Sequence, residues 1–396
     1  MPRKLDDLCP RPEPAAPRVT EPTTPAIYPA AVYRCRDPEQ AEAILRGELS
    51  GHIYRRESHP NADQLAQLCA ALHGAEAALI TASGMAAIAA AALSELSAAD
   101  HVVLSRRLYG RSEQLLSDEF GRFGVESTSV DLGKLDHVRD AIRSNTRLIL
   151  VETISNPTLR VADLQALANL AHRHGARLLV DNTFAGPVTC RPLTLGADLV
   201  VESLTKIING HGDVLLGMLC GSREAIDRAR LVAVRWGFSP SPFDCWLAVR
   251  GMGTLALRMD RAAHNARKVA QRLASRDEVV EVLYPGLPSH PDRPIAERQF
   301  GCCGGFMVSF TLSGGVKSAK AFIAGAREIS FSPSLGELTT MLSHPASTSH
   351  FAMPRPDREA LGIHDGTIRL SVGIESAEFV VDAVCQGLDA VRDALA

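Results

Sequence analysis

The sequence predicts an α/β protein with a doubly wound, mostly parallel β-sheet, followed by a smaller α+β domain. Three observations predict this fold. Helical and strand-like segments alternate from about residue 64 onward, which is typical of a parallel sheet with helices on both faces. A long amphipathic helix follows at about residue 255, and strands and helices are then mixed to the last residue. With 396 residues and 46% hydrophobic side chains, the chain exceeds the size at which one core usually stops growing.

The elements can be assigned in chain order. Residues 1–25 hold seven prolines and almost no periodic hydrophobicity, which predicts an extended arm. We assign residues 1–54 to this N-terminal arm, residues 55–249 to a large domain and residues 250–396 to a small C-terminal domain. In the large domain, hydrophobic periodicity predicts helices at 64–73, 85–96 and 161–174, and strands at 77–81, 101–104, 148–152, 178–180 and 199–202.

The small domain has a similar mixture. Apolar residues recur at steps of four and three along one predicted helix, which gives it a single apolar face: Leu255, Met259, Ala262, Ala266, Val269 and Leu273. This helix is expected to link the two domains. Beyond it, the pattern predicts strands at 305–312 and 367–372 and helices at 316–324 and 378–394.

Composition excludes several classes of partner. A formal charge of -3, without a basic stripe that carries aromatic residues, argues against nucleic acid. No apolar run is long enough for a membrane span, and the first residues lack the apolar core of a signal peptide, so we expect no membrane contact and a cytoplasmic location. The adjacent Cys302-Cys303 has no zinc-site spacing, and His172 and His174 do not share a helix face, so no metal is expected.

The most informative residue is Lys206, which follows the strand at 199–202. Asp181 ends another predicted strand 25 positions upstream. A lysine amine can form a Schiff base with an aldehyde, while a carboxylate on a neighbouring strand can keep a pyridine nitrogen protonated. Ser203 and Thr205 carry hydroxyls suited to a phosphate oxygen. This combination predicts pyridoxal 5'-phosphate, although each element taken alone is more often structural.

Further motifs carry a family resemblance from about residue 25 to the end. The chain resembles the Cys/Met-metabolism pyridoxal-phosphate enzymes, a family that includes cystathionine γ-lyase, methionine γ-lyase and cystathionine γ-synthase. The resemblance implies the fold type I architecture of the aspartate aminotransferase-like transferases, with a seven-stranded sheet. It is carried by residues 51–56 (GHIYRR), 82–85 (ASGM), 108–110 (LYG), 155–157 (SNP), 180–184 (VDNTF), 203–213 (SLTKIINGHGD), 334–336 (SLG) and 369–373 (RLSVG).

The resemblance also implies roles around the cofactor. Ser83, Gly84 and Met85 precede an alanine-rich helix, whose N-terminal N–H groups favour an anion. The family places the cofactor phosphate there, joined by Ser203 and Thr205. In the family, Tyr54 and Arg56 reach this phosphate from a neighbouring subunit, so the resemblance implies active sites shared between chains of a homotetramer. Thr183 belongs to the same cofactor-binding set.

The substrate implied is a small amino acid. Tyr109 would stack on the pyridine ring and exchange protons near the substrate amine. Arg369 would grip the substrate's α-carboxylate through two charge-assisted hydrogen bonds, helped by Asn156 and the backbone near Ser334. Lys206 would both hold the cofactor and move protons, while Asp181 keeps the ring nitrogen protonated. The structural alternatives are a half-buried tyrosine for Tyr109 and an internal salt bridge for Arg369.

Several positions bear on substrate choice. Ile53 stands where cystathionine γ-lyases tend to be acidic, and Thr339-Thr340 replaces a frequent Glu-Ser, so negative charge is lost. Arg111 stands where methionine γ-lyases carry cysteine, which speaks against a dedicated methionine γ-lyase. Arg111 either contacts an anionic distal group of the substrate or is a solvated arginine at the mouth of the site.

The sequence therefore predicts a lyase of trans-sulfuration that cleaves a carbon–sulfur bond by γ-elimination from L-cystathionine or a related amino acid. The enzyme alternatives are γ-replacement on an activated homoserine, as in cystathionine γ-synthase or O-acyl-homoserine sulfhydrylases, and β-elimination, as in cystathionine β-lyase. A cofactor-binding scaffold is a further alternative, which the intact Lys206, Asp181, Tyr109 and Arg369 oppose. A nicotinamide-binding fold is disfavoured because no glycine-rich fingerprint follows a strand.

Overall fold

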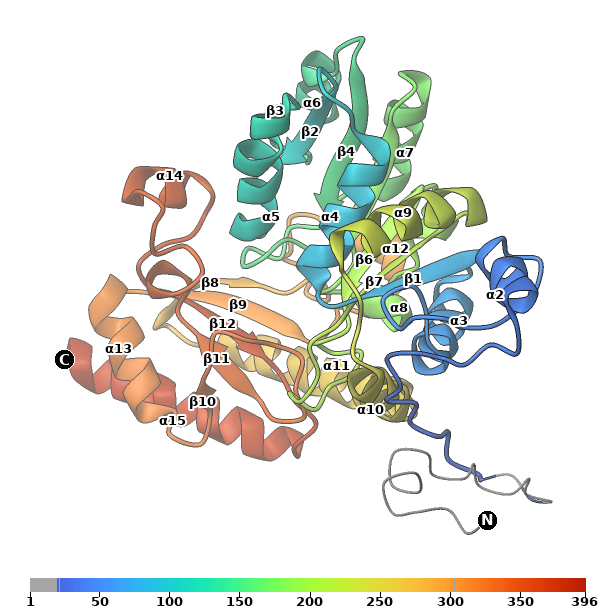
Figure 1. Ribbon diagram of the computed structural model, residues 1–396. Coiled ribbons are helices and arrows are strands. Elements are labelled where there is room, and N and C mark those ends of the chain that lie inside the picture. Colours follow the sequence, from blue (N-terminus) through green and yellow to red (C-terminus); the bar gives the residue numbers. More distant parts are fainter. Residues whose placement is uncertain (1–19, 21, 302) are drawn as a thin grey trace.

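The computed structural model describes residue 20, residues 22–301 and residues 303–396. Two β-sheets lie side by side, each covered by helices, and the chain passes from the first to the second through long helices (Figure 1). Most of the proline-rich start of the predicted arm lies outside the described residues, as does Cys302 of the adjacent cysteine pair.

The large sheet has seven strands in the order β1-β7-β6-β5-β4-β2-β3. The five strands from β6 to β3 are parallel, whereas β7 is antiparallel to both of its neighbours. The predicted mostly parallel, seven-stranded sheet is therefore confirmed. Its strands are β1 (Ala77–Thr81), β2 (His101–Ser105), β3 (Glu126–Val130), β4 (Thr146–Glu152), β5 (Arg177–Asp181), β6 (Leu199–Ser203) and β7 (Gly217–Gly221).

Successive side chains of the central strands enter two different cores, one on each face of the sheet. In β4, Ile149 and Val151 join the first core, whereas Leu148 and Leu150 join the second. This double burial explains why the central strands are continuous apolar runs instead of alternating ones. The first core includes α3 (Pro60–His73), α7 (Leu164–Arg173) and α10 (Pro242–Met252); the second includes α4 (Gly84–Glu95) and α9 (Arg223–Trp236).

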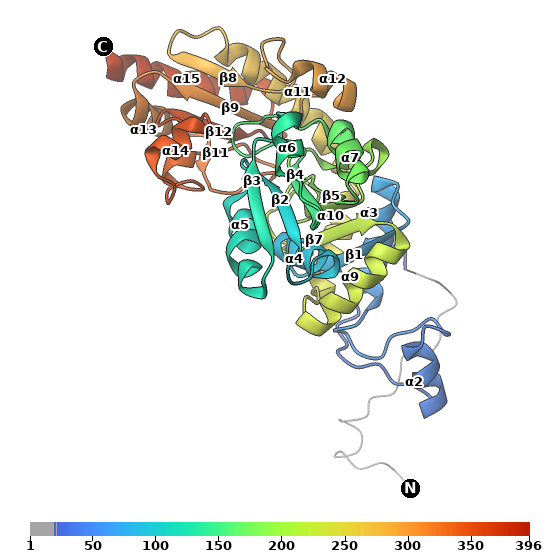
Figure 2. The ribbon, with the colours of Figure 1, turned by 90° about the horizontal axis from the view of Figure 1, so that it is seen from above.

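The small sheet has five strands in the order β10-β11-β12-β9-β8, and it shares one core with three helices. Figure 2 shows this sheet and its helices beside the large sheet. The strands are β8 (Val279–Leu283), β9 (Met307–Leu312), β10 (Ser330–Phe331), β11 (Met341–Ser343) and β12 (Thr367–Ser371). The helices are α11 (Leu255–Leu273), α13 (Gly315–Gly325) and α15 (Ala377–Leu395). The predicted α+β unit is thus present.

Six shorter α-helices are also present in the described residues. They are α2 (Pro38–Leu45), α5 (Gly110–Gln114), α6 (Leu135–Ala141), α8 (Gly186–Thr189), α12 (Arg293–Phe300) and α14 (Arg355–Ala360). In the described part of the chain, no helix is both long enough and apolar enough to cross a membrane.

Several predicted boundaries differ in the structure; the helix expected at 64–73, for example, begins at Pro60. The helix expected at 161–174 begins at Leu164, because Val161 pairs with Ile154 in an isolated β-bridge and Asp163 caps the helix by accepting from the backbone N–H of Ala166. All strands of the large sheet lie within residues 77–221, and all strands of the small sheet lie within residues 279–371. The predicted division of the chain into an arm and two domains, at residues 54 and 249, stays a prediction.

Candidate active site

A cavity of about 260 Å³ opens where the parallel strands β4, β5 and β6 end. Ligands of open α/β sheets usually bind at this edge. The cavity brings together most of the residues singled out in the sequence, although they come from six separate segments. Those lining it are Ser83, Gly84, Met85, Tyr109, Asn156, Asp181, Thr183, Ser203, Thr205, Lys206 and Arg369.

Asp181 is the last residue of β5. One of its carboxylate oxygens accepts hydrogen bonds from the Thr183 backbone N–H at 3.0 Å and from the Thr183 hydroxyl at 2.6 Å. Burial raises the pKa of Asp181 to about 6, although the hydrogen bonds from Thr183 oppose the rise. A carboxylate that is fixed and poorly solvated gains most from a cationic partner such as a protonated ring nitrogen.

Lys206 follows β6, and its amine donates to the Ser334 hydroxyl at 3.0 Å. Burial lowers the pKa of Lys206, and the positive charge of Arg369 lowers it further, while Glu337 opposes both effects. A lowered pKa raises the fraction of neutral amine, which is the form that attacks a carbonyl carbon. The environment of Lys206 therefore suits a nucleophile and base.

The N-terminus of α4 forms one end of the cavity. Ser83 caps the helix by accepting from the Ala86 backbone N–H at 3.1 Å. A Cβ atom at Gly84 would meet the Cβ of Ser203 at 3.1 Å, and one at Gly217 would meet the Ser83 carbonyl oxygen at 2.2 Å. The two glycines thus let this helix end approach β6 and β7 closely, which leaves its first N–H groups directed at the cavity.

Two hydroxyls of the predicted phosphate end are already partly engaged. The Thr205 hydroxyl donates to the Leu216 carbonyl oxygen at 3.2 Å and accepts from the Leu216 backbone N–H at 3.1 Å. The Thr183 hydroxyl accepts from the Ser203 backbone N–H at 3.0 Å. These contacts fix the backbone between β6 and Lys206.

Arg369 lies in the middle of β12 and is only 4% exposed. Its Nη1 donates to the Asn156 side-chain oxygen at 2.8 Å, and its Nη2 donates to the Ser334 carbonyl oxygen at 2.9 Å. Its Nε is buried without a partner, and burial lowers the pKa of Arg369 to about 10. A buried guanidinium with an unused donor favours an anionic ligand.

Tyr109 is 42% exposed at the mouth of the cavity. Its backbone N–H donates at 2.7 Å to Glu152 Oε1, whose partner oxygen Oε2 accepts from the Asn156 backbone N–H at 3.1 Å. Burial raises the pKa of Glu152 to about 8, with the charge of Asp181 adding to the effect. Sequence reasoning missed this residue, although an acid at the carboxyl end of a buried strand, beside the Ser-Asn-Pro motif, is a usable signal.

Four predicted residues do not line this cavity within one chain: Tyr54, Arg56, Arg111 and Ser334, although the Ser334 hydroxyl accepts from Lys206. Tyr54 and Arg56 contact each other, with the guanidinium carbon of Arg56 5.4 Å from the centre of the Tyr54 ring. Arg111 is exposed and donates to the Gln114 side chain at 3.0 Å. Phe184, which also lines the cavity, was missed as well; its ring centre lies 5.9 Å from the guanidinium carbon of Arg369.

The described residues hold no group of three or more His, Cys, Asp or Glu side chains placed to bind a metal ion. His172 shares a hydrogen bond of 2.9 Å with Asp198.

The residues of the cavity fit pyridoxal phosphate. A helix N-terminus suits its phosphate, the carboxylate of Asp181 its ring nitrogen, the Lys206 amine its aldehyde, and the unpartnered Arg369 Nε leaves a donor for the substrate.

Comparisons with known proteins agree with this chemistry. The family model described as Cys/Met metabolism PLP-dependent enzyme matches residues 11–389. An L-methionine γ-lyase of Fusobacterium nucleatum subsp. polymorphum is 40% identical over 368 residues, 92% of this chain and 93% of that protein. A cystathionine γ-lyase of Bacillus subtilis is 38% identical over 359 residues, 90% of this chain and 93% of that protein.

Solved structures agree as well. The cystathionine γ-synthase of Xanthomonas oryzae pv. oryzae, in complex with aminoacrylate and cysteine, has a TM-score of 0.89 and 35% identity, and the match covers 94% of each chain. With its family motifs, its fold and its lysine and aspartate in one cavity, this chain belongs to the Cys/Met metabolism family of pyridoxal-phosphate-dependent enzymes.

Proposed function

We propose that this protein is a carbon–sulfur lyase that carries out γ-elimination on a sulfur-containing amino acid, with L-cystathionine as the first candidate. One observation carries the proposal. The Lys206 amine, the Asp181 carboxylate and the Arg369 guanidinium line one cavity. One small ligand can therefore meet a base that moves protons, a partner for the ring nitrogen and a hydrogen-bond donor for the substrate's carboxylate. Bound pyridoxal phosphate supplies the electron sink that stabilises a carbanion at the substrate's Cα.

The chain's own residues would then bind the substrate and move its protons. Arg369 would hold the α-carboxylate, because its Nε has no partner and its two Nη groups are fixed by Asn156 and Ser334. Lys206 would take the proton from Cα and return protons during elimination, which its lowered pKa favours. Asp181 would keep a positive charge on the ring nitrogen, and Tyr109 would cover the ring and exchange protons near the substrate amine.

The phosphate would bind at the N-terminus of α4, where Ser83, Gly84 and Met85 meet Ser203 and Thr205. Tyr54 and Arg56 would complete this end from a neighbouring subunit, since neither lines the cavity of its own chain. Several apolar residues of the same N-terminal segment are exposed in the single chain, including Tyr28, Val32 and Leu49. Exposed apolar side chains gathered in one segment favour burial against a second copy. This supports a second chain beside the site; a homotetramer and a cytoplasmic location stay predictions.

Substrate selection rests on fewer contacts. Thr340, the second residue of the Thr339-Thr340 pair that replaces a frequent Glu-Ser, donates its hydroxyl to Glu375 at 2.9 Å. The charge of Glu337 partly opposes the lowering of the Lys206 pKa, so Glu337 supplies negative charge that acts on Lys206. A negative charge near Lys206 suits the distal ammonium of cystathionine. A contact of Arg111 with an anionic substrate group stays a prediction.

The test is to incubate the cofactor-loaded protein with L-cystathionine and, separately, with L-methionine, and to identify the keto acid by mass spectrometry. We expect 2-oxobutyrate and cysteine from L-cystathionine, and no product from a Lys206→Ala variant. Pyruvate with homocysteine would instead make the protein a β-lyase. No keto acid, together with cystathionine formed from O-succinyl-L-homoserine and L-cysteine, would make it a γ-replacement enzyme, as the likeness to a cystathionine γ-synthase allows.

A further inference from the structure

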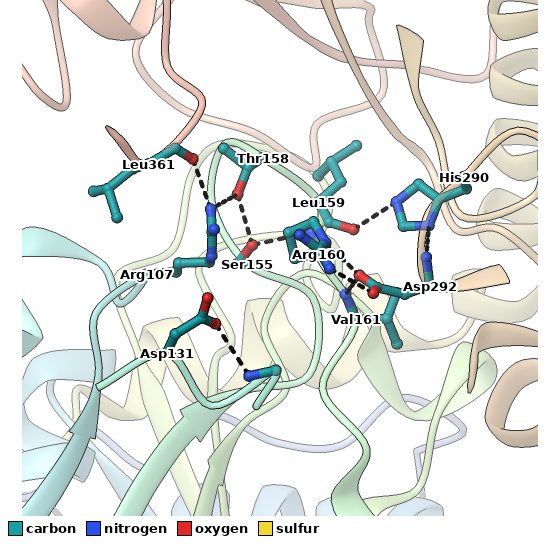
Figure 3. A network of polar contacts seen from close by, with 11 residues as sticks. Arg107, Asp131, Ser155, Thr158, Leu159, Arg160, Val161, His290, Asp292 and Leu361 are labelled. Atoms are coloured by element: carbon teal, nitrogen blue, oxygen red, sulfur yellow. Dashed lines mark hydrogen bonds and ion pairs between the residues drawn. The ribbon is translucent and has the colours of Figure 1, made fainter. Parts of the chain in front are cut away.

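The loop that carries Asn156 is also held by residues that come more than 130 positions later in the chain. This Asn156 loop, residues 153–161, connects β4 to α7, and nearly all of its residues are buried. Figure 3 shows Leu159, Arg160 and Val161 of the loop in contact with His290 and Asp292. Because buried backbone groups need partners, the contacts that satisfy this loop also fix its position.

Asp292 makes three of these contacts. Its carboxylate accepts from Arg160 Nε at 2.6 Å, from Arg160 Nη2 at 2.7 Å and from the Val161 backbone N–H at 2.9 Å. Asp292 is 8% exposed. Paired N–H donors on one carboxylate form a directional, charge-assisted contact, so Asp292 fixes both the place and the orientation of the loop's last two residues.

His290 adds a fourth contact next to it. The Asp292 backbone N–H donates to His290 Nδ1 at 3.2 Å, so Nδ1 is the acceptor and Nε2 carries the proton that it donates to the Leu159 carbonyl oxygen at 3.1 Å. Leu159 has a φ of +49°, a conformation that side chains rarely adopt without outside support. Asp292, through its backbone, therefore also helps to hold the strained part of the loop.

The other end of the loop meets the strand pair that carries Arg369. Ser309 of β9 donates its hydroxyl to the Pro157 carbonyl oxygen at 2.5 Å. Ser309 is the register partner of Arg369 in β12. The Asn156 side chain, which accepts from Arg369, directly precedes the residue that Ser309 holds, and the Asp292 contacts follow four and five residues later in the same loop.

We propose that Asp292 is a positioning residue for the substrate's α-carboxylate, because it fixes the Asn156 loop against the strand of Arg369 without lining the cavity itself. The inference rests on the proposed function, in which Arg369 and Asn156 receive that carboxylate. When Asp292 no longer holds Arg160, the Asn156 oxygen shifts and the Arg369 guanidinium loses its alignment. Ligands with an α-carboxylate are weakened, whereas ligands without one are not.

The experiment measures the binding of two probes to the holoenzyme through the change in cofactor absorbance. The probes are L-alanine and ethylamine, which differ by the carboxylate alone. In the wild type, L-alanine binds more tightly. The Asp292→Asn variant is expected to bind L-alanine roughly ten- to hundredfold more weakly, as misplacement of a binding group by about 1 Å does, with ethylamine binding within about twofold of the wild type.

A matched control breaks a second ion pair between the same two segments. Arg298 donates to Asp163 at 2.6 Å, just beyond the loop. Arg298→Gln is expected to leave the ratio of the two affinities unchanged. Asp292→Asn weakening both probes equally would indicate a general structural role and overturn the proposal, as would an unchanged ratio.

Two more variants keep the result decisive. If Asp292→Asn does not fold, Arg160→Lys replaces it, because lysine keeps the charge but lacks the two-pronged donor; a lowered preference for L-alanine supports the proposal and an unchanged one overturns it.

Arg369→Lys tests the proposed function separately. If it keeps the full preference for L-alanine, the carboxylate site itself is misassigned and the inference falls with it. Loss of preference in Arg369→Lys but not in Asp292→Asn overturns the inference alone.

Discussion

At the scale of single residues, Glu152 connects two parts of the candidate site. Its two carboxylate oxygens accept from the backbone N–H groups of Tyr109 and Asn156, which belong to different segments. It is 8% exposed and lies beside Asp181 in the strand register. One side chain thus sets the spacing between the residue proposed to cover the ring and the residue that contacts Arg369.

Replacing Glu152 by glutamine should lower kcat/KM by about tenfold or more. Glutamine has one acceptor oxygen, so one of the two buried N–H groups loses its partner, at a cost of about 1–3 kcal/mol. Steady-state kinetics with L-cystathionine would measure the effect. Glu119→Gln, which removes an exposed carboxylate paired with Arg122, serves as the control. A kcat/KM equal to that of the wild type would show that the two segments hold their spacing without Glu152.

His290 should make stability depend on pH. Burial lowers the pKa of His290 to about 4, from the 6.5 of an unfolded chain, even though the charge of Asp292 raises it. The unfolded state therefore binds a proton at a higher pH than the folded state, so this contribution is present above pH 6.5 and is lost as pH falls towards 4. At pH 4.5 the loss is about 2 to 3 kcal/mol.

The free energy of unfolding, measured with denaturant at pH 7 and pH 4.5, should fall less for His290→Gln than for the wild type. His172→Gln, at an exposed histidine paired with Asp198, is the control and should retain the pH dependence of the wild type. If the free energy of unfolding falls equally for the wild type and His290→Gln between pH 7 and pH 4.5, the imidazole is protonated as easily in the folded state as in the unfolded state.

At the scale of elements, the sequence predicted the central strands well, because each is a continuous apolar run with both faces buried. It missed β3, an edge strand of Glu, Ser and Thr, and β7, which begins and ends with glycine. Neither has the local pattern of a buried strand. Their pairing is decided by neighbours that lie tens of residues away, which local propensity does not report.

The glycine that begins β7 gives a prediction about the end of α4. Gly217→Ala should weaken cofactor binding by about tenfold or more, because its Cβ would lie 2.2 Å from the Ser83 carbonyl oxygen and the helix end must shift. Titration of the apoprotein with pyridoxal phosphate, followed by absorbance, would measure this. Gly121→Ala, whose Cβ meets no atom within 4 Å, is the control. Unchanged cofactor affinity in Gly217→Ala would show that the close approach of the α4 N-terminus to β7 is not needed for phosphate binding.

At the scale of the whole molecule, two residues predicted for the phosphate end of the candidate site do not line it in a single chain. Tyr54 is 43% exposed, and neither it nor Arg56 lines the cavity. Both belong to the segment that carries exposed apolar side chains. An incomplete phosphate end and an exposed apolar segment in the same region both fit a site completed by a second chain.

Mixing two inactive variants would test this arrangement. An Arg56→Ala chain paired with a Lys206→Ala chain forms one site with an intact Lys206 and an intact Arg56. After the chains are exchanged by refolding, activity should therefore return to about a quarter of the wild-type value, since half of random dimers are mixed and each has one intact site of two. Each variant refolded alone is the control. No recovery, with mixed oligomers verified by mass spectrometry, would place Arg56 in the site of its own chain.

The sequence by itself determined the fold class and the cofactor, because the apolar runs of the buried strands and the family motifs are local features of the chain; the residues around the cofactor stay predictions from those motifs. Lys206, Asp181 and Arg369 could be named from their motifs. Tertiary structure alone decided which groups fix them in place. Glu152, Asp292 and His290 act through backbone partners elsewhere in the chain, and Asp292 and His290 left no signal in the sequence that pointed to these contacts. Their roles follow from three-dimensional proximity.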